Sequence, residues 1–128
     1  MSERVHRWLE GFPLDEVLRG HVATVMVRLP AHVMEDFLAD PGFALCDYEP
    51  AAGAMTVVPV APPRRNAAAR SVVLKRTLRR RPESFVRYVI AHELAHAHLR
   101  NAGRWPGDDP EHAADALAAE WGYPRPQW

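Results

Sequence analysis

The sequence has little that would tie it to an oxidising compartment or to a membrane. Its 128 residues contain one cysteine, Cys46, which can form no disulfide within the chain and is typical of a reducing compartment. We expect Cys46 to be a small buried apolar residue rather than a nucleophile. No apolar run approaches the roughly 20 residues needed to cross a bilayer, and residues 1–4 lead into no signal-like apolar stretch. These absences predict a cytoplasmic protein that makes no membrane contact.

Net charge is also lacking, because 16 Lys and Arg residues balance 16 Asp and Glu residues. No global field therefore attracts nucleic acid or an anionic surface. Locally the balance fails, since residues 64–81 hold eight of the sixteen basic residues and no acidic one. This basic segment is either a solvated face that offsets the acidic residues between 108 and 120 or a site for an acidic peptide or nucleic acid. The first interpretation is favoured, because no interleaved aromatic residues offer stacking surfaces for bases.

Length and composition, with 48% hydrophobic and 25% charged residues, fit a single domain over residues 1–128. The apolar spacing predicts one or two short helices in the first twenty residues, a strand over 22–29 and a helix over 30–38. Three short strands are expected next, over 43–48, 55–60 and 70–74. The pattern predicts an α+β domain whose small, mainly antiparallel sheet packs on a later helix.

That later helix carries the most informative feature of the chain, the motif His92-Glu93-Leu94-Ala95-His96, or H-E-x-x-H. At about 100° per residue, the two histidines share one helical face and can bind one zinc ion. Glu93 falls on a flank of that face, where its carboxylate can act on a water held by the metal. The alternative is that His92 and His96 are core histidines with local hydrogen bonds and that Glu93 is a solvated helix residue.

The surrounding pattern supports a helix that is buried along one side. Pro82 suits a first helical turn, and Gly103 is a plausible C-terminal cap. Between them the apolar residues recur at helical spacing, namely Phe85, Val86, Val89, Ile90, Leu94 and Ala97. His98 lies about 240° from His92 around such a helix, so it should face away from a metal.

A catalytic zinc site needs a third protein ligand if a fourth position is to hold water. A second helix is expected to begin at Asp109-Pro110 and to end at Trp121-Gly122. Within it Glu111 and Asp115 are four residues apart and share a face, so one can bind zinc while the other accepts a hydrogen bond from a ligand histidine. We assign Glu111 to the metal, with His112 and Asp115 as competing ligands. The competing role for Glu111 is to stabilise the helix N-terminus by its charge.

The segments from Tyr88 to Leu99 and from Glu111 to Tyr123 together resemble the zincin metallopeptidases. The E-x-x-A-D portion, Glu111 to Asp115, is similar to the gluzincin pattern and to compact ImmA/IrrE-type domains. The residues just upstream, Leu74, Leu78 and Pro82, resemble SprT-like and YgjP-like minimal proteases, although a third histidine spaced as in SprT-like proteins is lacking. Over residues 71–123 the resemblance implies His92, His96 and Glu111 as zinc ligands, Glu93 as general base and Asp115 as a partner that orients a ligand.

These observations predict a zinc-dependent peptidase that acts on a peptide or protein substrate, with nucleic acid as a less favoured partner. Zn²⁺ is the expected cofactor, and Tyr88, His112 or an arginine is a candidate to stabilise the oxyanion formed during hydrolysis. Trp105 either lines the cleft or covers the core. The alternative function is a zinc-stapled regulatory or binding module whose basic segment, residues 64–81, contacts a partner protein or nucleic acid.

Overall fold

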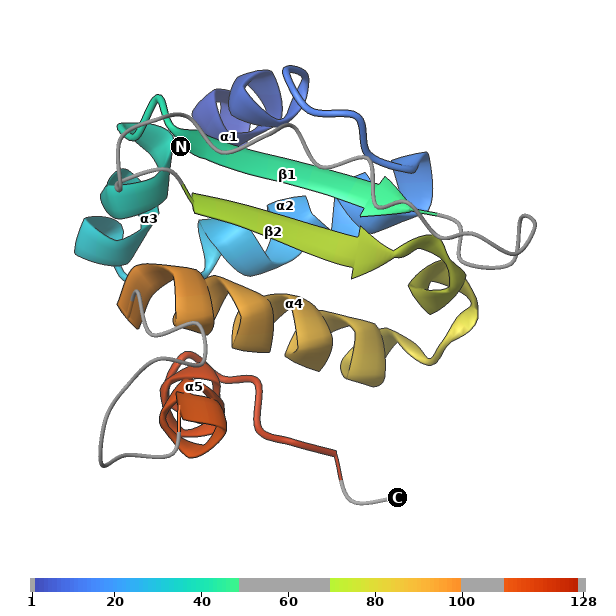
Figure 1. Cartoon of the computed structure of the whole chain (residues 1–128), viewed down its shortest axis with the longest axis vertical. Coiled ribbons are helices and arrows are strands. Elements are labelled where there is room, and N and C mark those ends of the chain that lie inside the picture. The colour runs from blue at the N-terminus through green and yellow to red at the C-terminus, as the bar shows by residue number, and fades with distance from the viewer. Residues whose placement is uncertain (1, 49–69, 100–109, 127–128) are drawn as a thin grey trace.

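A computed structural model of the chain describes residues 2–48, 70–99 and 110–126. Over these ranges helices precede, flank and follow two short strands, and the expected α+β class is confirmed (Figure 1). In chain order the elements are α1 (Ser2–Leu9), α2 (Glu16–Val27), α3 (Ala31–Leu38), β1 (Phe43–Tyr48), β2 (Arg70–Lys75), a 3₁₀ helix η1 (Arg76–Arg80), α4 (Glu83–Leu99) and α5 (Pro110–Glu120).

The two described strands pair in parallel, from Phe43 opposite Arg70 to Tyr48 opposite Lys75. The expectation of a mainly antiparallel sheet is therefore wrong for these strands. A parallel pair needs a crossover of a dozen or more residues, and residues 49–69 supply that length. The prediction assumed that neighbouring strands in the sequence would pair as hairpins. The third expected strand, over 55–60, lies outside the described residues.

The expected strand over 22–29 is also wrong, because most of this segment belongs to α2. The side chain of Asp15 caps the helix by accepting hydrogen bonds from two backbone N–H groups, at 3.0 and 3.2 Å. The buried residues of α2 recur at helical spacing, namely Leu18, Val22, Ala23, Val25 and Met26. The β-branched residues that favoured a strand are accommodated because their burial on one helical face outweighs a weak local preference.

The other expected elements are confirmed where the structure describes them. Helices α1 and α3 occupy the expected segments, and Pro30 is the N-cap residue of α3. Helix α4 begins directly after Pro82, whose carbonyl accepts the first intrahelical hydrogen bond from the N–H of Val86. The expected helix ends at Gly103 and Asp109 lie outside the described residues.

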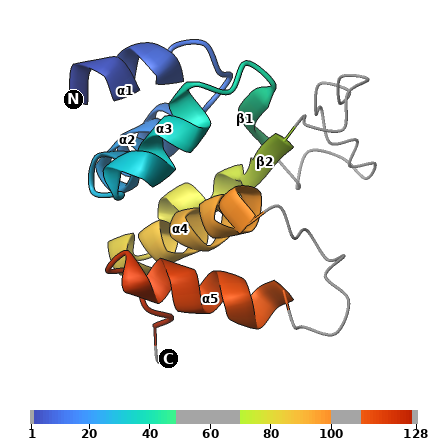
Figure 2. The ribbon, with the colours of Figure 1, turned by 90° about the vertical axis from the view of Figure 1, so that its left-hand side faces the viewer.

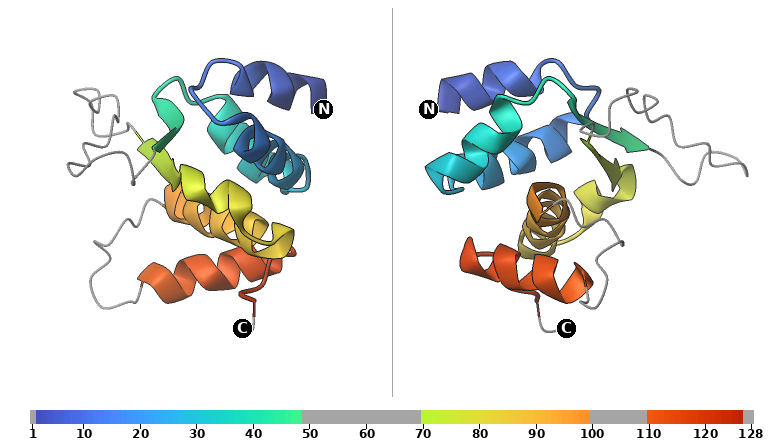
Figure 3. Two further views of the ribbon diagram at one scale, coloured as in Figure 1. Left: turned by 90° about the vertical axis from the view of Figure 1, so that its right-hand side faces the viewer. Right: turned by 60° about the vertical axis from the view of Figure 1, so that its left-hand side comes forward.

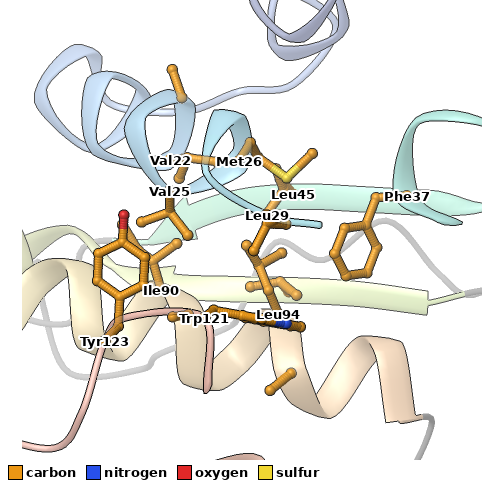
Figure 4. Packing of buried hydrophobic residues seen from close by; sticks show 14 of the residues in the cluster. Val22, Val25, Met26, Leu29, Phe37, Leu45, Ile90, Leu94, Trp121 and Tyr123 are labelled. Atoms are coloured by element: carbon orange, nitrogen blue, oxygen red, sulfur yellow. The ribbon is translucent and has the colours of Figure 1, made fainter. Parts of the chain in front are cut away.

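Helix α4 is central to the arrangement of the other elements. It runs beside β2 and lies between α5 on one side and the N-terminal helices on the other (Figures 2 and 3). One cluster of buried side chains joins these elements, and Figure 4 shows Ile90 and Leu94 of α4 among residues of α2, β1 and the segment after α5. The expected burial of Cys46, which is 8% exposed, is confirmed. No helix in the described ranges has the length and apolar content needed to cross a membrane.

Arg70, at the start of β2, ties three elements together. Its side chain is 8% exposed and forms ion pairs with Asp36 of α3 at 2.9 Å and with Asp40 at 2.7 Å. It also donates to the carbonyl of Ala97, near the end of α4, at 3.0 Å. The guanidinium of Arg70 therefore holds α3, β2 and the end of α4 in register.

We predict that Arg70→Met lowers the free energy of unfolding by about 3 kcal/mol, because it removes the arginine from its ion pairs with two largely buried carboxylates. Chemical denaturation followed by circular dichroism measures the effect. Arg7→Met is the control, because Arg7 is 76% exposed and its ion pair with Glu3 is long, at 3.9 Å. Equal stability of the two variants would contradict a structural role for the Arg70 cluster.

Candidate metal centre

His92 and His96 lie one turn apart on α4 and project from the same face, as the spacing predicted. Their side chains are 12% and 11% exposed, respectively. The Nε2 atoms of the two rings are 3.2 Å apart, and the ring planes are nearly perpendicular, at 88°. The opposite side of α4 buries Val86, Ile90 and Leu94 in the core, which fixes the direction in which the histidines point.

Glu111 approaches both histidines from the first turn of α5. One carboxylate oxygen, Oε1, lies 2.9 Å from Nε2 of His92, and the other, Oε2, lies 3.0 Å from Nε2 of His96. Each of the three side chains offers one donor atom within 4.8 Å of the other two. The structure therefore brings together the three residues that were expected to bind the metal.

Asp115 lies one turn after Glu111 on α5 and contacts the ring nitrogen of His92 that Glu111 does not contact. Its Oδ1 is 2.7 Å from Nδ1 of His92 and accepts a second hydrogen bond, of 2.6 Å, from the hydroxyl of Tyr88. Burial alone would raise the pKa of Asp115, but the hydrogen bonds from Tyr88 and His92 outweigh it and lower that pKa below its ordinary value. Burial and the hydrogen bond to Asp115 raise the pKa of Tyr88 to about 12, so its hydroxyl remains a donor.

The ionised Asp115 determines which nitrogen of His92 carries a proton. A carboxylate only accepts hydrogen bonds, so Nδ1 of His92 must donate, and neutral His92 then presents a lone pair at Nε2. That lone pair faces a carboxylate oxygen of Glu111 at 2.9 Å. Two acceptors this close repel each other unless His92 takes a second proton or a cation lies between them. A cation bound between Nε2 of His92 and Glu111 would relieve this repulsion.

The spacing of the donor atoms also fits zinc. Bonds of about 2.0–2.1 Å in a tetrahedral site place neighbouring ligand atoms about 3.3–3.4 Å apart. The Nε2 atoms of His92 and His96, 3.2 Å apart, lie close to this edge, and Glu111 brings one carboxylate oxygen to each of them, at 2.9 and 3.0 Å. Two imidazole nitrogens and one carboxylate oxygen are a usual ligand set for zinc. A small outward movement of the three side chains would accommodate the ion.

Glu93 is not one of the three converging residues, and it lines a cleft of about 830 Å³. The described walls of the cleft come from the end of β1, from β2, from η1 and from the face of α4 that carries Val89 and Glu93. Glu93 adjoins His92 in the sequence, about 100° around the helix from it, and lines the cleft, whereas none of the three donor residues does. The predicted role of Glu93 beside a metal-bound water stays a prediction.

Two other histidines were considered in the sequence. His112 is exposed on α5 and is not among the three converging side chains. His98 faces away from the cluster, as expected, and its Nδ1 lies 2.8 Å from Asp36. Trp105 lies outside the described residues. Among the described residues, the structure therefore places Glu111 rather than His112 beside the two motif histidines.

Sequence reasoning missed the role of Tyr88, which it considered only as a stabiliser of the oxyanion. Tyr88 lies one turn before His92 on α4, and its hydroxyl donates to the carboxylate that also contacts His92. Arg125 was missed as well, and its guanidinium is 3.7 Å from the other oxygen of Asp115. The four-residue spacing of Tyr88 and His92 was available as an indication, whereas the return of Arg125 to α5 depends on the fold.

Comparisons with known proteins add no relative. No protein-family model matches the chain, and neither the curated proteins nor the solved structures include a significant match.

We predict that Glu111→Gln weakens zinc binding by more than about 100-fold, whereas His112→Gln leaves it nearly unchanged. Glu111 contacts both motif histidines, and neutralising its carboxylate removes the only negative charge among the three donors. Competition with a chromophoric zinc chelator gives both dissociation constants. The reverse result, with His112→Gln losing the metal, would transfer the third ligand to His112.

Asp115→Asn should weaken zinc binding by about 10- to 100-fold, because an amide no longer holds Nδ1–H of His92 by a charged hydrogen bond. The matched control is Glu120→Gln, which removes an exposed carboxylate from the same helix. The same chelator competition measures both variants. Equal affinities for the two would exclude an orienting role for Asp115.

Proposed function

We propose that the chain is a zinc-dependent peptidase in which His92, His96 and Glu111 hold the metal and Glu93 is the general base. The observation that carries this proposal is the convergence of the three donors from two helices; Glu93, which adjoins His92 in the sequence, lines a cleft. The resemblance of the same residues to the zincin pattern supports it independently of the geometry.

An open coordination position supports a catalytic rather than a structural site. Structural zinc sites normally use four protein ligands, whereas catalytic sites use three and leave a position for water or substrate. Among the described residues three donors converge, and the Glu111 side chain is 68% exposed, so the site is open to solvent. Such a site is accessible to both water and a substrate carbonyl.

The chemistry can be divided between the metal and the protein. Bound zinc lowers the pKa of a water ligand to about 7 and polarises a substrate carbonyl. The Glu93 carboxylate accepts a proton from the attacking water and later delivers it to the nitrogen of the leaving amine. Asp115 keeps the proton of His92 on Nδ1, so that Nε2 stays available to the metal. Tyr88 supports Asp115 in this role through the hydrogen bond that its hydroxyl donates.

The alternative, a zinc-stapled module that binds a partner through residues 64–81, receives less support. Three of the basic residues in the described part of this segment already have acidic partners. Arg70 pairs with Asp36 and Asp40, Arg76 pairs with Asp47, and Arg79 pairs with Asp15. Much of the expected positive field is therefore neutralised within the protein. Residues 64–69 lie outside the described ranges.

We predict that Glu93→Gln lowers kcat/KM for peptide hydrolysis by about 10²- to 10⁴-fold, because it removes the proton acceptor while keeping the shape of the side chain. Zinc content and the midpoint of thermal unfolding should remain those of the parent. The measurements are cleavage of a quenched fluorescent peptide library, elemental analysis and calorimetry, with Glu120→Gln as the control. A Glu93→Gln protein that cleaved the library as fast as the parent would exclude this mechanism, as would a parent that cleaved no peptide when loaded with zinc.

A further inference from the structure

The cleft beside Glu93 combines apolar walls with two cationic side chains. Val73 of β2, Leu78 of η1 and Val89 of α4 supply aliphatic surface. Lys75 and Arg81 lie at the two ends of η1 and also line the cleft. Glu93 is the one acidic residue among its described walls. A group bound here would therefore meet apolar surface and positive charge next to the proposed general base.

The 3₁₀ geometry of η1 separates the basic residues of this region into two sets. With about three residues per turn, side chains three positions apart point in the same direction. Arg76 and Arg79 form one such pair, and both have carboxylate partners at 2.9 and 2.8 Å. Lys75, Leu78 and Arg81 follow the same three-residue interval and all line the cleft. Arg76 and Arg79 therefore pair with carboxylates of the fold, whereas Lys75 and Arg81 line the cleft.

Lys75 and Arg81 have no ion pair among the described residues, in contrast to Arg76 and Arg79. Both side chains are exposed. The guanidinium of Arg81 lies over the ring of Phe85, 4.4 Å from its centroid, which holds the charge at the cleft without neutralising it. The cleft thus has the charge and the apolar surface to bind an acidic side chain through its methylene groups and its carboxylate.

We propose that the substrate is a peptide with an acidic residue beside the scissile bond, whose carboxylate is bound by Lys75 and Arg81. This inference rests on the proposed function, because it places the scissile bond at the metal and the acidic side chain in the adjoining cleft. The volume of about 830 Å³ is larger than one side chain needs and accommodates a short stretch of extended peptide. The lining includes two aromatic residues, Tyr48 and Phe85, and Arg81 covers one ring face of Phe85. Aliphatic side chains supply more of the walls, which favours a peptide over a polynucleotide, whose bases need exposed ring faces.

The test compares the cleavage by zinc-loaded full-length protein of two sets of three quenched fluorescent peptides. Within a set the peptides differ only in having Glu, Gln or Lys next to the cleaved bond, on its N-terminal side in one set and on its C-terminal side in the other. We expect kcat/KM for the Glu peptide to exceed that for the Gln peptide by about ten-fold, the size expected of two partly exposed ion pairs. The preference should weaken as salt is raised. The Lys peptide should be the poorest of the three.

The variant Lys75→Met/Arg81→Met keeps the apolar stems and removes both charges. It should abolish the preference for Glu over Gln, so that the ratio of the two kcat/KM values falls from about ten to about one. Arg80→Met is the matched control, because Arg80 is a neighbouring exposed arginine that does not line the cleft. It should retain the full preference.

A binding measurement separates failure of this inference from failure of the proposed function. Fluorescence anisotropy with the Glu93→Gln protein gives dissociation constants for the labelled Glu and Gln peptides without hydrolysis. If the parent cleaves no peptide but Glu93→Gln binds the Glu peptide about ten-fold more tightly through Lys75 and Arg81, the peptidase proposal fails and the recognition of acidic peptides stands. Equal binding and cleavage of Glu and Gln peptides overturns the inference, as does an equal loss of preference in Arg80→Met. The inference would also be overturned if a single-stranded oligonucleotide displaced the labelled Glu peptide at a lower concentration than the unlabelled Glu peptide does. That result would favour a nucleic-acid ligand.

Discussion

The contact between α4 and α5 is the constraint on which the candidate site depends. The candidate metal donors come from both helices. The side chains of Glu111 and Asp115 are short, so α5 must lie close to α4 for their carboxylates to reach the histidines. Alanines make this possible, since the distance between packed helices depends on the side chains at their contact. Ala91 and Ala95 of α4 and Ala114 and Ala118 of α5 are all completely buried. Larger residues at these positions would move the two helices apart. The donor atoms would then be separated although the donor residues themselves were unchanged.

The polar side chains at this contact form a chain of hydrogen bonds in which each bond has a defined donor and acceptor. Tyr88 donates to Asp115, Asp115 accepts from Nδ1 of His92, and Nε2 of His92 is left to face Glu111. Without a cation or a second proton on His92, the chain ends in two opposed acceptors, which is costly in a partly buried site. A bound cation would draw α5 toward α4. The proposed metal binding would then be coupled to the docking of α5, and part of the binding free energy would contribute to folding.

The candidate site could be predicted largely from the sequence, because its residues follow local spacing rules. His92 and His96 are one turn apart, as are Glu111 and Asp115, and each pair needs only a helix to share a face. The strand directions could not be predicted in the same way, because they depend on how residues 49–69 connect β1 to β2. The second half of α2, from Val22 on, was mistaken for a strand, because its β-branched residues outweighed the helical spacing of its buried positions. Tertiary packing decides such a segment, and local preference does not.

The basic segment shows most clearly what the sequence cannot resolve. Between residues 75 and 81 the charges form a nearly continuous run, which composition alone treats as one positive surface. The structure divides this run, because two of its arginines meet aspartates that are 29 and 64 positions away in the chain. Only long-range contacts could reveal which charges are paired within the fold; of the other charges in the run, Lys75 and Arg81 lie at the cleft beside Glu93. The three-residue period of η1 therefore links a structural role, ion pairing within the fold, to a candidate role in substrate selection.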